Sequence, residues 1–384
     1  MRPPYSEAMA SLLSETADSA SKFFSQALSR ALSEGLGGKS SSSFGLRALA
    51  RTRSIVYTGE SLMIPVIELL VNRKRPHLPS DDMAFFNVAR NALNKVIEDD
   101  IDRIERGIYP AEVLRAEHIL QHFRRFPVLF SEGLKASLRR KSKKARVFGE
   151  EAKDLLRGLP EYYQRNFHFQ GDGYLSERSA ELYEHQVEVL FAGSADAMRR
   201  MIIEPLREQF GPGDGEGLTF LEVGAGTGRA TLFVRMAFPK AKIIAVDPSG
   251  PYLKKAQKQL EPYQRHGFFE ALGEKLPFQD QTFDAVYSVF LFHELPREVR
   301  RQVIKEGHRV LKPGGFYGFV DSLQLGDTPE LDSGLKQFPT QYHEPFYRDY
   351  IETPMTNLLT ESGFAIASQG TGFFSKFVSA KKTT

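Results

Sequence analysis

The chain has 384 residues, a formal net charge of +3 and no cysteine. This length allows one large or two ordinary domains with a sizeable core, and so small a net charge does not by itself indicate a nucleic-acid partner. A sequence without cysteine excludes disulfides, thiolate catalysis and cysteine-ligated metal sites. No basic segment leading into an apolar run opens the chain, and its longest apolar patch is too short to span a membrane, so we expect a cytoplasmic protein.

Residues Ser6 to Leu36 predict an amphipathic helix, because apolar side chains follow the capping residue Ser6 at steps of three and four. Such a stripe commonly packs against its own domain or against a second copy, as in a homodimer. The alternative is a membrane surface, although the polar face is mostly serine and carries few basic residues. Residues 37–44 read GGKSSSSF and predict a flexible linker. We therefore assign residues 1–44 to a helix and a linker.

Residues 45–159 predict a region made only of helices, since their apolar side chains recur at helical spacing and do not alternate as in a strand. The helical segments are roughly Glu60–Asn72, Asp81–Arg106, Ala111–Arg125 and Val128–Arg140. We expect Ser80 to cap the second segment. Pro127 is expected to separate the last two segments, because proline removes a backbone donor.

A basic run from Lys135 to Arg146 contains seven lysine or arginine residues and no acidic residue. A run of this kind is commonly a solvated face. The functional alternatives are contact with an anionic membrane surface or with an acidic substrate carrier. RNA is disfavoured because no aromatic side chains interrupt the run to stack on bases. We therefore expect no nucleic-acid partner, and we expect any peripheral membrane contact through residues 1–36 or 135–146.

Residues 160–210 predict an aromatic and helical segment. Its first part is too rich in tyrosine and phenylalanine for a plain linker, and these rings can fill the joint between the helical region and the next domain. Two serine-capped helices are expected to follow, Ser176–Phe191 and Ser194–Phe210. A glycine-rich stretch, Gly211–Gly215, then leads into a C-terminal domain, residues 211–384.

The C-terminal domain opens with the pattern strand, glycine loop, helix, strand, acid. An apolar run, Leu218–Val223, breaks into GAGTG at residues 224–228, and a second apolar run, Ile243–Val246, stops at Asp247. Glycines are needed where the chain turns sharply and where backbone approaches a ligand, and an acid at the second strand tip can accept hydrogen bonds from a ribose. The pattern therefore predicts a nucleoside site. A dinucleotide motif would need a third glycine where this chain has Arg229.

Strands and helices continue to alternate after Asp247. We expect strands at His266–Ala271, Phe283–Phe290 and Phe316–Val320, and helices at Pro251–Leu260 and Arg297–Val310. This alternation predicts right-handed crossovers and therefore an α/β fold with a Rossmann-like doubly wound sheet. The all-α N-terminal region precedes it.

Glu222 and the glycine loop together resemble the first motif, E/D-x-G-x-G-x-G, of class I S-adenosylmethionine-dependent methyltransferases. Three later stretches resemble that family in the same order: DPS from Asp247, EKLPF from Glu274 and RVLKPGG from Arg309. The resemblance covers about residues 217–380. It is nearest to the methyltransferase type 11, or ubiquinone/menaquinone C-methyltransferase, group.

The resemblance implies S-adenosylmethionine as the cofactor, and an antiparallel last strand in a closing hairpin formed by Phe364–Gln369 and Phe373–Ala380. It also implies that the aromatic segment folds over cofactor and substrate. Cofactor contacts are then expected from Glu222, Gly224, Gly226, Gly228, Asp247, Leu272, Gly273, Glu274 and Phe290.

In that family the glycines would let backbone approach the cofactor, Glu222 would orient its amino group and Asp247 would take the ribose hydroxyls. Relatives often place Gly-Asp-Ala before the EKLPF stretch, with the aspartate holding the adenine amino group. This chain has Ala271-Leu272-Gly273 there instead. We expect the backbone of Leu272 and Gly273 to contact the adenine instead, with Glu274 as the nearest side chain.

Methyl transfer from a sulfonium requires alignment and exclusion of water, and in some cases a base. His293 follows the fourth strand, at the position that faces the transferred methyl in this fold, and an imidazole titrates near neutrality. A structural role is the commoner one for a single histidine. His343, in the insert after the fifth strand, and His168, in the aromatic segment, are further candidates. The spacing of His293, Glu294 and His343 does not predict a metal site.

These features predict an enzyme that transfers a methyl group from S-adenosylmethionine to a small or lipid-like acceptor, such as a quinone, polyketide or fatty-acid-derived molecule. The many aromatic residues around 167–174 and 338–350 would suit an apolar acceptor. One alternative is a non-catalytic protein that keeps the cofactor fold and binds a partner through its helical region. The other is an NAD-linked oxidoreductase, which Arg229 disfavours.

Overall fold

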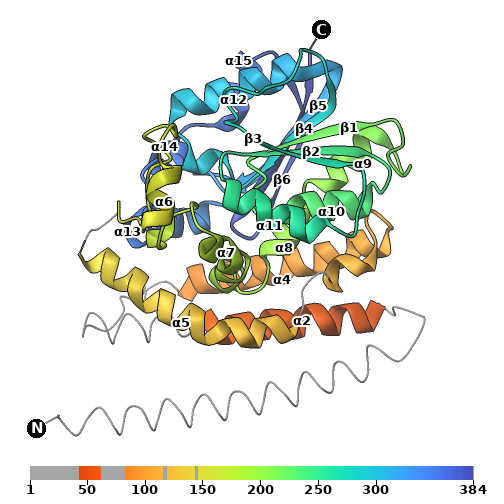
Figure 1. Ribbon diagram of the computed structural model, residues 1–384. Helices are drawn as coiled ribbons and strands as arrows, with labels where there is room; N and C mark the ends of the chain where they lie inside the picture. Colours follow the sequence, from red (N-terminus) through yellow and green to blue (C-terminus); the bar gives the residue numbers. More distant parts are fainter. Residues whose placement is uncertain (1–42, 62–82, 116–118, 143–145, 384) are drawn as a thin grey trace, which may run out of the picture.

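The computed structural model describes residues 43–61, 83–115, 119–142 and 146–383 (Figure 1). Outside these residues lie the expected helix Ser6–Leu36, most of the linker 37–44, most of the helix Glu60–Asn72, the cap Ser80, and Lys143 and Lys144 of the basic run. Those expectations stay predictions. In the described part of the chain no helix is both long and apolar enough to cross a membrane.

A seven-stranded sheet forms the centre of the C-terminal half, with the strand order β3-β2-β1-β4-β5-β7-β6. Its strands are β1 Thr219–Val223, β2 Lys242–Asp247, β3 His266–Glu270, β4 Phe283–Val289, β5 Leu311–Ser322, β6 Phe364–Gly372 and β7 Ser375–Lys382. Strands β1 to β5 are parallel, and β7 lies antiparallel between β5 and β6. This confirms the predicted fold class. The order of the strands reverses beside β1, and ligands of open α/β sheets bind at such a point.

Helices cover both faces of this sheet (Figure 1). The helices and short 3-10 turns from residue 167 onward are η2 Phe167–Phe169, α7 Glu177–Leu190, α8 Ala195–Arg200, α9 Ile203–Phe210, α10 Arg229–Ala237, α11 Gly250–Leu260, η3 Phe292–Glu294, α12 Arg297–Val310, η4 Pro329–Leu331, α13 Asp332–Gln341, α14 Tyr347–Glu352 and α15 Met355–Glu361.

The sheet has a hydrophobic core on each face. On β1, Phe220 packs in a core with Phe233 of α10, whereas its neighbour Leu221 packs in a core with Ile304 of α12. Successive side chains of a strand point to opposite faces. With both faces buried, the strands read as unbroken apolar runs.

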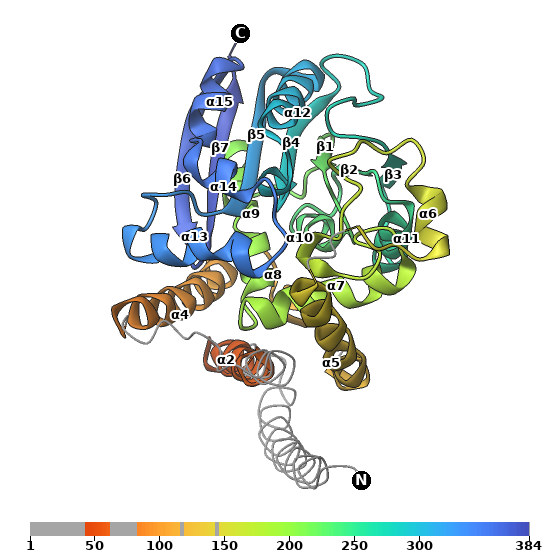
Figure 2. The same cartoon turned by 90° about the vertical axis from the view of Figure 1, so that its left-hand side faces the viewer.

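The N-terminal helices share a core with the sheet. Their described members are α2 Ser43–Ser61, α4 Met83–Glu105, η1 Ala111–Arg115, α5 Ile119–Lys141 and α6 Glu150–Leu155. Figures 1 and 2 show α2, α4 and α5 on the same side of the sheet. Val96 and Ile101 of α4 belong to the core that also holds Phe233. Among the described residues before β1 there is no strand, as expected. The boundaries 1–44, 45–159, 160–210 and 211–384 stay a prediction.

Three expected helix boundaries are wrong, and two of them involve proline. A helix was expected to begin at Glu60, but α2 already runs from Ser43 to Ser61 and includes the last two residues of the expected linker. The helix α5 continues through Pro127, which was expected to end a helix. Pro127 is exposed, so water can replace the hydrogen bond that its missing N–H cannot make. The expected helix Ser194–Phe210 is two helices, α8 and α9. Pro205 has no N–H for the carbonyl of Met201, and it lies in the first turn of the new helix, where proline is tolerated.

Candidate active site

A cavity that is open to solvent lies at the carboxyl ends of β1, β2 and β4. The loop after β1 forms one wall, and aromatic side chains from the segment before α7 and from α7 form another. The expected cofactor residues that line it are Glu222, Gly224, Gly226, Asp247, Leu272, Gly273, Glu274 and Phe290. Three expected site residues do not line it, namely Gly228, His293 and His343.

The glycines of the loop have different physical roles. All three adopt positive φ angles, +72° at Gly224, +52° at Gly226 and +78° at Gly228, where a side chain is strained. A Cβ at Gly226 would meet only the Cδ1 atom of Tyr252, at 3.9 Å, so this position is open for a ligand. A Cβ at Gly228 would lie 2.7 Å from the Cβ of Ala256. Gly228 therefore permits α10 to pack closely on α11, which differs from its expected contact with the cofactor.

Replacing Gly228 with alanine is expected to lower the free energy of unfolding by about 1–3 kcal/mol, because the new methyl group overpacks the contact between α10 and α11. Gly226→Ala is the matched control, because Gly226 also has a positive φ but has open space around the new methyl. Gly226→Ala should lower the free energy of unfolding less than Gly228→Ala does, and it should weaken cofactor binding more. Urea unfolding and calorimetric titration measure the two quantities, and the reverse pattern would contradict the assignment.

Asp247 connects the glycine loop to the end of β2. Its Oδ2 accepts a hydrogen bond from the N–H of Gly226 (2.8 Å) and its Oδ1 accepts one from the N–H of Ser249 (2.9 Å). The hydroxyl of Ser249 in turn donates to the carbonyl of Tyr174 (2.5 Å), in the aromatic segment. Burial raises the pKa of Asp247 to about 6. A buried carboxylate at this strand tip is available for the hydroxyls of a ribose.

Glu222 lies beneath the loop and is buried. Its Oε2 accepts hydrogen bonds from the Thr231 hydroxyl (2.5 Å) and the Tyr287 hydroxyl (3.0 Å). Burial raises the pKa of Glu222 to about 7, because the charged form loses its hydration. These two hydroxyls fix the carboxyl group of Glu222 at the wall of the cavity.

Glu274 has a partner that the sequence did not reveal. The hydroxyl of Tyr162 donates to the Oε1 of Glu274 (2.5 Å), and both residues line the cavity. Gly273 beside it has no room for a side chain, since a Cβ would lie 2.7 Å from the Cγ1 of Val223. Tyr162 thus closes the wall where the adenine ring was expected.

His293 is buried and is held by Asp321. Its Nδ1 lies 2.6 Å from the Oδ1 of Asp321, and the Oδ2 of Asp321 accepts from the N–H groups of Leu291 (3.1 Å) and Phe292 (2.7 Å). Burial lowers the pKa of His293, but the Asp321 carboxylate outweighs it and raises the pKa to about 9. An imidazole that is already protonated at neutral pH is a poor general base. The geometry favours a positioning role for His293.

Glu294, next in the chain, lines the cavity itself. Its Oε1 accepts a hydrogen bond from the hydroxyl of Tyr174 (2.5 Å), and burial raises its pKa to about 7. His343 is half-buried on the turn before α14, and burial lowers its pKa. His168 approaches Glu294, with its Nε2 atom 3.9 Å from the Oε1 of Glu294. The structure therefore brings His168, and not His343, to the edge of the cavity.

The lining of the cavity fits S-adenosylmethionine, which carries positive charge on its sulfonium and amino groups. Four carboxyl groups line it, those of Glu222, Asp247, Glu274 and Glu294. The guanidinium groups of Arg199 and Arg229 also line it, and both pair with Asp196, at 2.9 and 2.6 Å. The aromatic walls can stack on a base and attract a cation. The rings that line the cavity belong to Tyr162, Tyr163, Phe167, Tyr174, Tyr183, Tyr252 and Phe290.

The known proteins that this chain resembles include methyltransferases. Residues 220–315 match the family described as a methyltransferase domain. A fatty-acid O-methyltransferase from Mycolicibacterium smegmatis is 29% identical over 153 residues, which are 38% of this chain and 53% of that protein. A demethylmenaquinone methyltransferase from Thermotoga maritima is 27% identical over 213 residues, 52% of this chain and 86% of that protein. A solved S-adenosylmethionine-dependent methyltransferase from Aquifex aeolicus is 22% identical, with a TM-score of 0.36 over 47% of this chain and 89% of that one.

The chain contains a class I methyltransferase domain. The family match, the strand order and the glycine loop with its strand-tip acid agree on this assignment, and S-adenosylmethionine is the cofactor of the family. The chain spans about half of the fatty-acid O-methyltransferase, 53% of its length. The family match over residues 220–315 therefore gives the domain and leaves its acceptor open.

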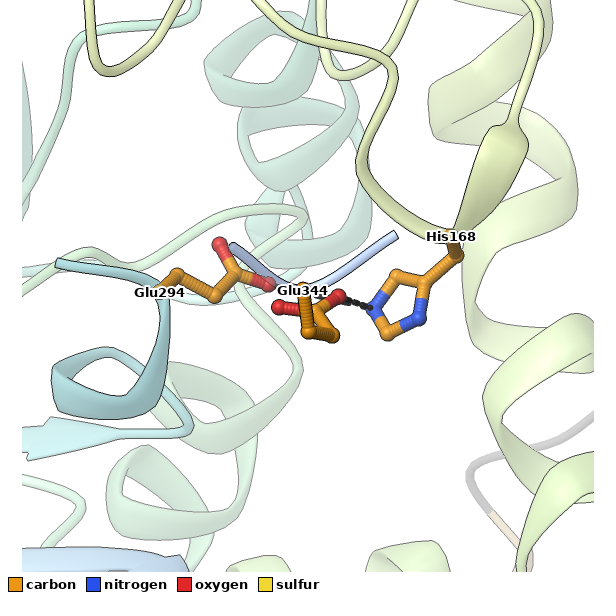
Figure 3. Close-up of side chains that lie close together, drawn as sticks. All are labelled: His168, Glu294 and Glu344. Atoms are coloured by element: carbon orange, nitrogen blue, oxygen red, sulfur yellow. Dashed lines mark ion pairs between the residues drawn. The ribbon is translucent and has the colours of Figure 1, made fainter. Parts of the chain in front are cut away.

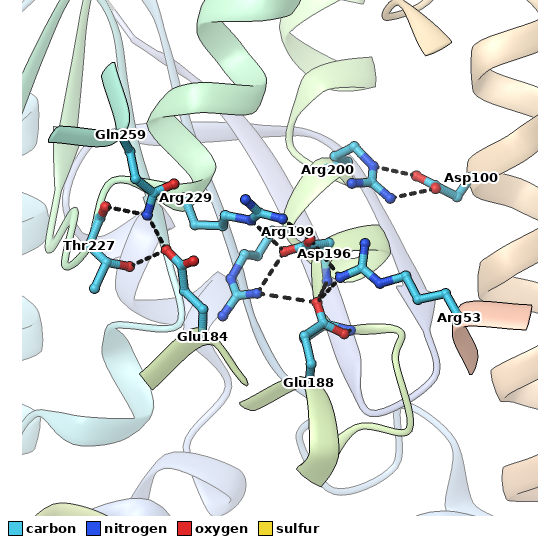
Figure 4. A network of polar contacts seen from close by, with 11 residues as sticks. Arg53, Asp100, Glu184, Glu188, Asp196, Arg199, Arg200, Thr227, Arg229 and Gln259 are labelled. Atoms are coloured by element: carbon cyan, nitrogen blue, oxygen red, sulfur yellow. Dashed lines mark hydrogen bonds and ion pairs between the residues drawn. The ribbon is translucent and has the colours of Figure 1, made fainter. Parts of the chain in front are cut away.

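The methyltransferase domain is joined to the N-terminal helices by a buried network of charges (Figure 4). Asp196 of α8 binds Arg229 of α10 (2.6 Å), Arg53 of α2 (2.8 Å) and Arg199 (2.9 Å). Arg229 is the residue that replaces the third glycine of a dinucleotide motif. Its guanidinium is held by Asp196, so this helix start is fixed by the segment that precedes the sheet.

Two further contacts extend this connection. Asp100 of α4 and Arg200 of α8 form a buried bidentate pair, with nitrogen to oxygen distances of 2.8 and 2.6 Å. Glu184 of α7 accepts a hydrogen bond from the hydroxyl of Thr227 in the glycine loop (2.9 Å). The helices before β1 thus contact the loop directly (Figure 4).

Proposed function

We propose that this protein transfers a methyl group from S-adenosylmethionine to a lipid-like acceptor, such as a quinone, polyketide or fatty-acid-derived molecule, by in-line displacement. The observation that carries the acceptor class is a second cavity, open to solvent and formed largely by α5 and α7. Most of its exposed lining surface is apolar, and the apolar residues are Leu129, Phe130, Ala136, Val187, Val189 and Leu190. Four charged side chains also line it, those of Glu60, Glu132, Arg139 and Arg140. A cavity of this composition suits the hydrocarbon part of a ligand.

The names of similar proteins support the same class. Those at 27 to 31% identity include a fatty-acid O-methyltransferase, a demethylmenaquinone methyltransferase and a malonyl-[acyl-carrier protein] O-methyltransferase. Two of these names describe a fatty acid or an acyl carrier, and one describes a quinone. The apolar cavity of this chain lies outside the matched range 220–315.

The two cavities approach one another at His168 and Glu294. His168 lines the apolar cavity and Glu294 lines the cofactor cavity. The Nε2 of His168 is 3.9 Å from the Oε1 of Glu294. An acceptor with its chain among α5 and α7 would therefore present its polar end at this junction, facing the cofactor.

When bound, the cofactor supplies a methyl group on a sulfonium that is already activated for displacement. The chain supplies alignment: Asp247 would hold the ribose, and Glu222 the amino group. Tyr174 and Tyr183 line the cavity from the segment outside the sheet and exclude water. Proximity and orientation of this kind contribute roughly 7–11 kcal/mol to lowering a barrier between two reactants.

A test of this function uses cofactor labelled in its methyl group. We expect label in long-chain fatty acids or demethylated quinones and little in their short polar analogues. Ala136→Phe narrows the apolar cavity, which Ala136 lines, and should slow transfer to the long acceptors without changing cofactor affinity. Leu138→Phe is the matched control, because Leu138 is 52% exposed on the same helix. Cofactor binding without label in any acceptor would instead support a non-catalytic partner-binding protein.

Cofactor affinity is expected to fall on acidification. Burial raises the pKa of Asp247 to about 6 and that of Glu222 to about 7. Ionised carboxylates attract a cationic ligand, so binding favours the unprotonated forms. Between pH 8 and pH 5 both groups take up protons in the free protein, which should weaken binding by roughly tenfold or more. Calorimetric titration across this range measures the effect. Asp247→Asn should show a smaller fall, and tighter binding at low pH would contradict the assignment.

A further inference from the structure

Three side chains from distant parts of the sequence converge at the junction of the two cavities: His168 of η2, Glu294 of η3 and Glu344 on the turn before α14 (Figure 3). One ligand atom from each lies within 4.8 Å of the other two. The His168 Nε2 is 3.2 Å from the Oε1 of Glu344 and 3.9 Å from the Oε1 of Glu294. In Figure 3 the Glu344 carboxyl group lies between the His168 ring and the Glu294 carboxyl group.

Glu344 is the residue that indicates a missing partner. Its side chain is 0% exposed, and among the described residues neither of its carboxylate oxygens has a hydrogen-bond donor. The His168 ring neutralises it only if that ring is protonated. A buried carboxylate without a donor or a cation is costly in a protein interior.

Further carboxyl groups surround the cluster. Asp321 lies behind the cluster and is paired with His293 at 2.6 Å, and Glu294 takes its hydrogen bond from the Tyr174 hydroxyl. Three carboxyl groups therefore face this region, those of Glu294, Asp321 and Glu344, with the His293 ring among them. Carboxylate oxygens gathered in one place are ligands that a divalent cation accepts.

We propose that His168, Glu294 and Glu344 bind a divalent metal ion of the Mn²⁺ or Zn²⁺ class. One imidazole nitrogen and two carboxylate oxygens are a ligand set that these ions accept, whereas Mg²⁺ prefers oxygen alone. Two ligands at roughly 2.1 Å from a common ion lie about 3 to 4 Å apart, which agrees with the separations of 3.2 and 3.9 Å. The Tyr174 hydroxyl bond to Glu294 would orient that ligand, as outer contacts of metal sites do.

The position of the ion suggests its use. It would lie between the cofactor cavity and the apolar cavity, where it can hold an oxygen of the acceptor and favour its deprotonated form. This use rests on the proposed function, whereas metal binding itself does not. The site was not expected from the sequence, because the ligands come from three segments that share no ligand spacing.

The test is direct metal binding by the full chain without cofactor or acceptor. The protein is stripped with a chelator, then titrated separately with MnCl₂ and with ZnCl₂ by calorimetry, and the bound metal is counted by elemental analysis. We expect one ion per chain. Glu344→Gln, which keeps the shape of the side chain, should weaken binding at least tenfold. Glu161→Gln should bind as the wild type does, because Glu161 is exposed and paired with Arg146 (2.8 Å).

Two results would overturn the proposal: no ion bound by the wild-type chain, or equal binding by Glu344→Gln. A second measurement guards against misfolding. In the metal-free state Glu344→Gln should melt no lower than the wild type, since neither carboxyl oxygen of Glu344 has a hydrogen bond to lose. A lower melting temperature would mean that Glu344 has a protein partner, which also overturns the proposal. S-adenosylmethionine titrated into the same protein reports on the methyltransferase site, so the two assignments fail separately.

Discussion

Replacing Asp196 with alanine is expected to lower the free energy of unfolding by about 3–5 kcal/mol, because it leaves buried guanidinium groups without their carboxylate. Asp196 is 1% exposed and binds Arg53, Arg199 and Arg229. Burial alone would raise its pKa, yet Arg229 and the neighbouring guanidinium groups hold the pKa of Asp196 well below its usual range. Urea unfolding monitored by circular dichroism measures the change.

The control for this prediction is Asp154→Ala. Asp154 pairs with Arg157 at 3.8 Å, and both side chains are more than four-fifths exposed, at 81% and 86%. Exposed pairs contribute little to stability, so this variant should unfold as the wild type does. If Asp196→Ala were equally neutral, the network in Figure 4 would not hold the N-terminal helices to the methyltransferase domain.

Replacing Asp247 with alanine is expected to weaken S-adenosylmethionine binding by about 1.5–3 kcal/mol, roughly 10- to 150-fold, for each charge-assisted hydrogen bond lost. The variant also removes the acceptor for the Gly226 N–H (2.8 Å). The glycine loop therefore loses a hydrogen bond in addition to those that the ribose would lose. Calorimetric titration with the cofactor measures the loss. Asp280→Ala is the control, because Asp280 is 70% exposed and does not line the cavity. Unchanged affinity in Asp247→Ala would mean that the ribose is held elsewhere.

The sheet and its helices were predictable because their signals are local. Apolar runs that end in glycine or acid mark the strands, and the helix expected at Arg297–Val310 has those bounds in the structure. Local sequence signals do not predict a helix boundary that depends on the surroundings of a residue. The helix α5 continues through Pro127, which is exposed to water, whereas α8 and α9 are separate helices near Pro205, which lacks an N–H donor. Val96 and Ile101 pack against the sheet, a contact that periodicity alone cannot indicate.

The candidate site divides in the same way. Motif spacing predicted the residues of the glycine loop and Asp247, but it could not tell that Gly228 serves helix packing and Gly226 the cavity. The aromatic composition before Ser176 was the available signal for Tyr162 and Tyr174, without showing which carboxylates they bind. Glu344 gave no signal at all, since its importance depends on burial and on His168.

Calorimetric titration of the full chain with S-adenosylmethionine and, separately, with NAD tests most directly whether the domain binds the methyl donor. We expect one molecule of S-adenosylmethionine bound per chain and no heat from NAD, because Arg229 stands where a pyrophosphate-binding loop needs glycine. Binding of NAD, or no binding of S-adenosylmethionine by the folded chain, would contradict it.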